Sequence, residues 1–212
     1  MGLIQSAFWL LLAQLGWSKE PLALLTIGIG IWLTGGLHLD GLMDTADGLA
    51  AGKEKCSEAM RDSRVGSMGV QALTIVLLIQ LAALLRLDSL SPLAMPIAMF
   101  WGRCSTLWAI DKFSYLHKEN TTSFHRKHWK EWKEFTPSAL ILFITFLCFQ
   151  FSPINSISRL SFSLGILIGF FPAYLVPKLL GRKLGGHSGD SYGASLVLVE
   201  TLMLLTLAVI WQ

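Results

Sequence analysis

Charged residues are scarce in this 212-residue chain, since only 15% are Asp, Glu, Lys or Arg while 53% are hydrophobic. Water-soluble globular domains carry about 25% charged residues, so the composition excludes that class and indicates a polytopic membrane protein. Cysteine is also rare. Cys56, Cys104 and Cys148 are widely spaced and form no CxxC pair, which excludes a disulfide framework and a cysteine zinc site. The net charge of +3 is small, and no nucleic-acid partner is expected.

Long apolar runs are abundant, and several approach the ~18 to 20 residues that span a bilayer. The first and fifth runs are short, so the sequence predicts an all-α integral membrane protein with six or seven transmembrane helices. Neither an internal repeat nor a long linker divides the chain, and we expect a single membrane-embedded domain over residues 1–212. The N-terminus has no basic segment or cleavage site typical of a signal peptide. The apolar runs cover residues 3–16, 21–37, 70–87, 90–110, 136–151, 160–180 and 192–211.

The basic residues of the loops predict the orientation in the membrane. The loops at 38–69, 111–135 and 178–191 hold 4, 6 and 3 Lys or Arg residues, which is 13 of the 17 in the chain. Lys and Arg concentrate on the cytoplasmic side of membrane proteins. These three loops are therefore predicted to face the cytoplasm, and the motifs described below all lie on that side.

Three aspartates follow the second apolar run, within the segment GGLHLDGLMDTADGL at residues 35–49. Asp40, Asp44 and Asp47 are spaced i, i+4 and i+7, which places them within a ~60° arc of one helix face. Three close anions repel one another unless cations lie among them. Oxygen ligands at this spacing suit a hard divalent ion, most of all Mg²⁺. The alternative is a solvated acidic face, which is the usual interpretation for a helix of a soluble protein.

The second polar motif, MRDSRVGSMG at residues 60–69, precedes the third apolar run. Arg61 and Arg64 are three residues apart and would share a helix face, an arrangement that suits phosphate oxygens. Asp62 would either pair with these arginines or complete a metal site. The alternative is a charged cap at the membrane surface.

Two charged residues interrupt apolar runs. Arg103 lies midway along the fourth run, where a charge costs on the order of 3 kcal/mol and needs a partner. Glu200 lies two to three turns into the last run and is one candidate partner for Arg103. A substrate phosphate and backbone carbonyls are the other candidates.

A glycine-rich segment, GGHSGDSYGA at residues 185–194, leads into the last run. Backbone N–H groups near a helix start, together with a hydroxyl, are typical of an anion-binding loop. Asp190 would either cap the helix or bind metal. Gly186 and Gly193 belong to this predicted loop.

Aromatic and basic residues alternate at residues 124–135, FHRKHWKEWKEF. This pattern is typical of an amphipathic helix lying on anionic lipid, which we favour over nucleotide recognition. His125 and His128 have no carboxylate at ligand spacing and receive no role.

The motifs GGLHLDGLMDTADGL, MRDSRVGSMGV and GGHSGDSYGASLVLVETL, in this order and separated by apolar runs, resemble the cobalamin synthase family, adenosylcobinamide-GDP ribazoletransferase. The resemblance covers essentially the whole chain. It implies an integral membrane enzyme that uses Mg²⁺ to join adenosylcobinamide-GDP to α-ribazole or its 5′-phosphate and releases GMP. This chain starts, with MGLIQSAFW, inside the family's first apolar region, so either the true start lies upstream or the chain is a truncated or unusually short member that lacks the family's N-terminal segment. The residues that match the family's polar positions are Asp40, Asp44, Asp47, Asp62, Asp190, Arg61, Arg64, Arg103 and Glu200.

The resemblance implies a protein of the bacterial cytoplasmic membrane, with its site on the cytoplasmic side. It also implies a role for each of these residues. Metal ligands would be Asp40, Asp44 and Asp47, with Asp62 or Asp190 for a second ion. The catalytic set would be Asp40, Asp44, Asp47, Asp62, Arg61 and Arg64, and the substrate-binding set His38, Arg103, Gly186, Asp190, Gly193 and Glu200.

Three other functions are weighed against this one. A CDP-alcohol phosphotransferase expects Asp-Gly-x-x-Ala-Arg, whereas Asp40-Gly41 is followed by Leu42-Met43-Asp44. A prenyltransferase expects a second aspartate-rich helix. An ion-coupled transporter expects carboxylates at the membrane midplane and repeat symmetry.

Overall fold

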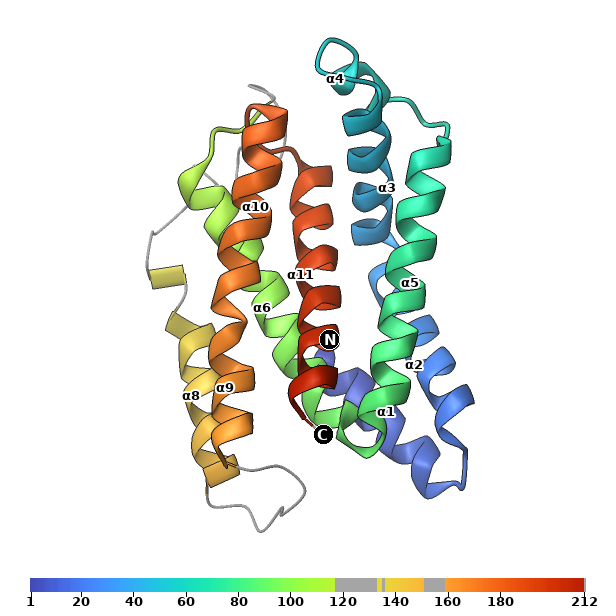
Figure 1. The fold of residues 1–212 in the computed structure, drawn as a ribbon, viewed down its shortest axis with the longest axis vertical. Coiled ribbons are helices and arrows are strands. Elements are labelled where there is room, and N and C mark those ends of the chain that lie inside the picture. The colour runs from blue at the N-terminus through green and yellow to red at the C-terminus, as the bar shows by residue number, and fades with distance from the viewer. Residues whose placement is uncertain (117–132, 135, 151–158, 212) are drawn as a thin grey trace.

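A computed structural model describes residues 1–116, 133–134, 136–150 and 159–211. All of its regular elements are helices, which confirms the predicted all-α class over the described part of the chain. Figure 1 shows one long helix, α11, in the middle of the bundle, with α3 and α5 on one side and α6 and α10 on the other. The elements are α1 (Gly2–Gln14), α2 (Lys19–Thr34), α3 (Leu37–Ala50), α4 (Cys56–Ala59), α5 (Ser67–Leu87), η1 (Asp88–Leu90), α6 (Ser91–Lys112), α8 (Thr136–Gln150), α9 (Arg159–Ile168), α10 (Phe170–Leu184) and α11 (Gly189–Ile210).

Helix α11 is the packing centre of the fold. It contacts α3, α5, α6 and α10. Of its apolar 18-residue segment, 61% is buried, against 22% of the corresponding 18-residue segment within Ser67–Lys112. Because helices from both halves of the chain pack on it, this last segment holds the others together.

The core has two parts that correspond to the two ends of the bundle. A larger cluster joins α1, α2, α5, α6, α9, α10 and the C-terminal half of α11, with fully buried Phe162, Met203 and Leu207. A smaller one, which includes Leu42 and Val197, joins α3, α5, α10 and the N-terminal half of α11. The smaller cluster fixes α3 against α11 and so positions the polar motifs above it.

Helices α2 and α3 meet at an angle of 88°. The corner consists of Gly35 and Gly36, whose φ angles of 59° and 71° are in the left-handed region that only glycine adopts at little cost. The chain therefore turns inside the second predicted apolar run, and the acidic segment forms a separate helix. Residues 40–47 are helical, which is the condition under which the spacing of the three aspartates places them on one face.

Three helical stretches among the described residues are long and apolar enough to cross a membrane, or four if the bent α2–α3 pair counts as one span. One of them, Ser67–Lys112, contains α5, η1 and α6, and Figure 1 shows α5 and α6 as two arms of a V joined at η1. The length and apolar composition of these helices thus indicate an integral membrane protein. The predicted count of six or seven spans stays a prediction. The amphipathic segment at 124–135 lies almost entirely outside the described residues.

Candidate active site

The site begins where the N-terminal halves of α3 and α11 touch. A Cβ on Gly41 would lie 2.6 Å from the carbonyl oxygen of Asp190, and a Cβ on Gly193 would lie 3.2 Å from Cα of His38. Only glycine permits so close an approach of two backbones. The aspartate motif and the glycine-rich motif, which are far apart in the sequence, are therefore brought together.

The carboxylates gather at this contact. Asp44 is half-buried and interacts electrostatically with Asp40, Asp190 and Asp47, all of which repel its negative charge. In the described part of the chain no Lys or Arg forms an ion pair with Asp40, Asp44 or Asp190. Like charges that stay close without a neutralising partner favour the binding of a cation.

Asp47 differs from the other two aspartates of the motif. Its carboxylate accepts hydrogen bonds from the backbone N–H groups of Gly66 (2.7 Å) and Gly69 (2.9 Å), at the first turn of α5. A carboxylate at this place satisfies N–H groups that the helix itself leaves free and complements its dipole. Asp47 therefore fastens α3 to α5, a role that sequence spacing does not reveal.

The arginine motif lies in the loop between α4 and α5. Arg64 donates to both carboxylate oxygens of Asp62, with the shortest distance 2.7 Å, and these hydrogen bonds lower the pKa of Asp62 to about 2. Of the two predicted alternatives for Asp62, the structure shows the pairing with arginine. Arg64 is 86% exposed at its side chain, so this pair lies at the surface.

The glycine-rich loop is held in place by buried hydrogen bonds. Ser188, not Asp190, caps α11, since its hydroxyl accepts from the N–H of Ser191 while the Ser191 hydroxyl accepts from the N–H of Ser188. A Cβ on Gly186 would lie 2.6 Å from the carbonyl oxygen of Ser114, so this glycine is needed for packing. Asp190 is left free of the capping role and faces α3.

His187 anchors the same loop and was not predicted. It is fully buried, and its Nε2 donates to the carbonyl of Pro177 (3.0 Å) while its Nδ1 lies 2.9 Å from the Ser191 hydroxyl. Because a carbonyl only accepts, Nε2 carries the proton and Nδ1 accepts from the hydroxyl. Burial lowers the pKa of His187, so the ring is neutral at pH 7.

Arg103 and Glu200 form the second ion pair of the site. Arg103 Nη1 donates to Glu200 Oε1 (2.5 Å) and to the carbonyl of Met99 (3.3 Å). The sequence prediction that Glu200 is a partner of Arg103 is confirmed. The pair lies deeper in the bundle than the aspartates, because Glu200 follows Asp190 by ten residues of α11, which is about 15 Å of helix.

Fit to a metal ion depends on the carboxylates at the α3–α11 contact. Among the described residues, no group of three or more His, Cys, Asp or Glu side chains lies close enough to hold a metal by itself. Mg²⁺ commonly uses one or two carboxylates, waters and substrate phosphates, so the oxygen donors of Asp40, Asp44 and Asp190 are chemically suitable. Metal binding therefore stays a prediction here.

A basic pocket at the same end of the bundle was not predicted. It lies between the end of α3, the loop before α4 and the end of α10, and its cations are Lys53, Arg182 and Lys183. In the sequence, each of these residues contributed only to the prediction of membrane orientation, as a basic residue of a loop. Their convergence depends on the packing of α3 and α10 on α11, which no local sequence signal reports.

These features define a class of protein: a helical integral membrane protein with an acidic site beside basic side chains at one end of its bundle. Within that class, the chain belongs to the cobalamin-5-phosphate synthase family, whose model matches residues 1–208. The match confirms the resemblance seen in the three motifs.

Curated relatives carry the name adenosylcobinamide-GDP ribazoletransferase. The protein from Prochlorococcus marinus strain MIT 9303 is 55% identical over 216 residues, which cover 99% of this chain and 82% of the relative. The protein from Prochlorococcus marinus strain SARG is 50% identical over 213 residues, with the same coverage. The protein from Thermosynechococcus vestitus is 37% identical over 186 residues, covering 85% of this chain and 71% of the relative. No solved structure matches the chain.

Proposed function

We propose that the chain acts as an adenosylcobinamide-GDP ribazoletransferase, with the carboxylates at the α3–α11 contact as its reaction centre. The family membership gives the reaction. The observation that supports this location is the gathering of Asp40, Asp44 and Asp190 without a described cationic partner. The acceptor is α-ribazole or its 5′-phosphate.

In this reaction, the 3′-hydroxyl oxygen of the ribazole attacks the phosphorus bonded to cobinamide. A new P–O bond forms, the P–O bond to GMP breaks, and the hydroxyl proton passes to a general base. Asp40 is exposed and Asp44 half-buried, so either carboxylate is accessible to take this proton. Since both lie on α3, which α11 and α5 hold in place, the base is kept in position before the substrates arrive.

The cofactor that would suit these residues is Mg²⁺, with one or two of Asp40, Asp44 and Asp190 as ligands and with waters and substrate phosphates as the others. When bound, the ion would supply positive charge for the diphosphate and for the departing GMP. Asp47 would act indirectly, by holding α3 against α5, because its carboxylate already caps α5. The second ion predicted with Asp62 would require that the Asp62–Arg64 pair opens.

Positive side chains around the site attract the anionic substrate. Lys53, Arg182 and Lys183 line the basic pocket, and Arg64 is exposed in the loop that begins beyond α4. Together with Arg61, these groups would bind phosphate oxygens and raise the local concentration of substrate.

The protein would lie in the bacterial cytoplasmic membrane with this end of the bundle toward the cytoplasm. The support is the concentration of Lys and Arg in the loops at this end. The orientation would give the site access to soluble nucleotides. The sequence and structure give no oligomeric state.

The test uses purified protein in detergent with adenosylcobinamide-GDP and α-ribazole, and it measures GMP release during a magnesium titration. We expect turnover that needs both substrates, is abolished by EDTA and returns with Mg²⁺. Because detergent abolishes any gradient, this turnover also separates an enzyme from a transporter. Turnover that persists unchanged in EDTA would contradict the metal assignment, and absence of GMP release at any magnesium concentration would contradict the function.

A further inference from the structure

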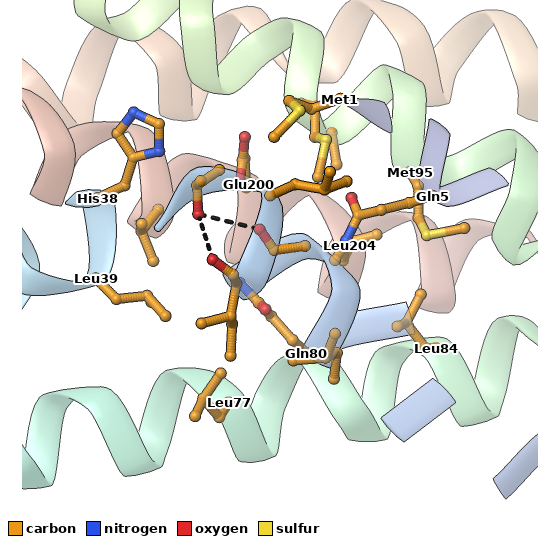
Figure 2. Close-up of a pocket in the computed structure, with 18 of the residues that line it drawn as sticks. Met1, Gln5, His38, Leu39, Leu77, Gln80, Leu84, Met95, Glu200 and Leu204 are labelled. Atoms are coloured by element: carbon orange, nitrogen blue, oxygen red, sulfur yellow. Dashed lines mark hydrogen bonds between the residues drawn. The ribbon is translucent and has the colours of Figure 1, made fainter. Parts of the chain in front are cut away.

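A pocket lies beneath the acidic site, inside the bundle. Together with its open mouth it encloses about 780 Å³, and its walls come from α1, α2, α3, α5, α6 and α11. Figure 2 shows Glu200 in its middle, His38 on one side, and Gln5 and Met95 on the other. Most of the lining is aliphatic or sulfur-containing, including Leu39, Leu77, Leu84, Met95, Val197 and Leu204.

The side-chain charges of this pocket are paired with each other among the described residues, and the amino group of Met1 lies close enough to interact with Glu200. Arg103 is neutralised by Glu200, and Gln80 donates to the Thr201 hydroxyl (2.9 Å). A charged ligand would have to displace or oppose the ion pair, so the pocket suits an uncharged and largely apolar ligand. This is the opposite of the acidic site above it.

Two hydrogen-bonding groups in the wall are still available to a ligand. Gln5 is 7% exposed, and its Oε1 has no partner in the described structure, while its Nε2 donates to the Thr26 carbonyl. Arg103 uses only Nη1 in its described hydrogen bonds, which leaves Nε and Nη2 as donors. A buried amide oxygen without a partner is unfavourable unless a ligand or a water donates to it.

The pocket reaches the first turn of α3 at His38 and Leu39, which precede Asp40 in the sequence. His38 lines the pocket, lies two positions before Asp40 on α3, and has its backbone against Gly193 of α11. A ligand in the pocket would therefore extend past His38 to reach Asp40 and Asp44.

The two substrates differ in whether they have a part that could enter this pocket. The corrin ring of adenosylcobinamide-GDP, with its many amide arms, is far too large, and its diphosphate is charged. The acceptor has a flat, uncharged bicyclic base with two methyl groups, joined to a ribose that bears the reacting hydroxyl. Its size and apolar edge match the aliphatic lining, and its free ring nitrogen matches the Arg103 donors.

We propose that this pocket binds the base of the acceptor nucleoside, so that the ribose points past His38 toward Asp40 and Asp44. This inference rests on the proposed function and adds the acceptor subsite to it. Aliphatic side chains of α5 and α11 pack on the faces of the base, and Arg103 donates to its ring nitrogen. A water between Gln5 Oε1 and the ligand satisfies the remaining acceptor.

The first experiment compares two substitutions on α5. Leu77 lines the pocket, whereas its neighbour Leu78 is 59% exposed on the outer surface of the bundle. Leu77→Trp fills the pocket, and Leu78→Trp adds the same side chain outside it. Equilibrium dialysis with labelled α-ribazole should show binding at least about tenfold weaker for Leu77→Trp, and unchanged for Leu78→Trp. Binding of adenosylcobinamide-GDP should stay within about twofold in both, which also reports that the variants are folded.

The second experiment uses the unmodified protein and so does not depend on the folding of a variant. Free 5,6-dimethylbenzimidazole should compete with labelled α-ribazole and leave adenosylcobinamide-GDP bound. Absence of competition, or loss of adenosylcobinamide-GDP instead of α-ribazole in Leu77→Trp, would overturn the inference. Failure of the proposed function has a different signature, namely no GMP release by the unmodified protein.

Discussion

The carboxylates at the α3–α11 contact and the carboxylate of Glu200 lie in different electrostatic surroundings. At the α3–α11 contact, Asp44 has other aspartates as its neighbours and no described cation. About 15 Å deeper along α11, Glu200 has Arg103 at 2.5 Å. The protein neutralises the carboxylate it buries within the apolar pocket, and leaves unneutralised those at the end of the bundle. The unpaired group is therefore the one that we propose receives a cation and an anionic substrate from outside.

The strongest test of this contrast is Asp44→Asn. Removal of one carboxylate from the unpaired group should lower GMP release about 100-fold or more, because the charge that holds the cation is reduced. Thermal stability in EDTA should be equal or higher, since like-charge repulsion is relieved. Activity assays and thermal unfolding of the same preparation measure the two effects.

Asp88, at the C-terminal end of α5 and away from the acidic site, provides a matched control. Asp88 is exposed in η1, and asparagine has nearly the same size and shape without the charge. Asp88→Asn should leave GMP release unchanged. If Asp44→Asn kept near-normal activity, or if it destabilised the protein in EDTA, the distinction between the two regions would be wrong.

The opposite behaviour is expected of Glu200→Gln. It leaves the Arg103 charge without its partner and should lower the free energy of unfolding by about 2 kcal/mol, a value below that of a fully buried pair because the Arg103 side chain is 38% exposed. Unfolding in mixed micelles measures the change. The double variant Arg103→Gln/Glu200→Gln should regain part of the loss, and a double variant less stable than Glu200→Gln would refute the pairing argument.

Asp47 sharpens the comparison within α3 itself. Asp47→Ala removes the acceptor for the N–H groups of Gly66 and Gly69 and should cost about 1 kcal/mol of stability, as loss of a helix cap does. Asp47→Asn keeps one carbonyl oxygen and should cost less. Hydrogen exchange of the first turn of α5 reports the loss directly, and unchanged protection there would contradict the capping role.

The smallest effect is expected from pH. His187 has a lowered pKa in the folded protein, against about 6.5 in the unfolded chain, so the unfolded state binds more protons as the pH falls. Its contribution to stability is present above pH 6.5 and is lost as the pH falls toward the folded-state pKa. Between pH 6.5 and 6.0 the loss should be less than about 0.7 kcal/mol. His187→Gln should remove this part of the pH dependence, and an identical profile in both proteins would argue against it.

The sequence predicted those features that depend on local spacing or on a charge in an apolar run. The helix that carries Asp40 and Asp44 follows from their i, i+4 spacing, and the pairing of Arg103 with Glu200 follows from the cost of isolated charges in lipid. The opening of α11 by a glycine-rich loop was also expected.

The features that the sequence did not predict all require contacts between distant segments. The carboxylate of Asp47 caps α5 only because α3 lies beside the first turn of α5. Helix α11 is capped by Ser188, and not by Asp190 as one of the two alternatives predicted. The 88° corner at Gly35 and Gly36 divides one apolar run into two helices, which hydropathy alone reads as a single span. The pocket that Gln5 and Gln80 help to line is likewise a product of packing.

The contact between α3 and α11 has a consequence for biosynthesis. Asp44 and Asp190 are 146 residues apart, and translation at about 5 to 20 residues per second separates their emergence from the ribosome by roughly 7 to 30 s. During this interval the acidic helix is already made while its partner does not yet exist. With the reaction centre proposed at the α3–α11 contact, we expect activity to begin only when the last helix has been inserted and docked.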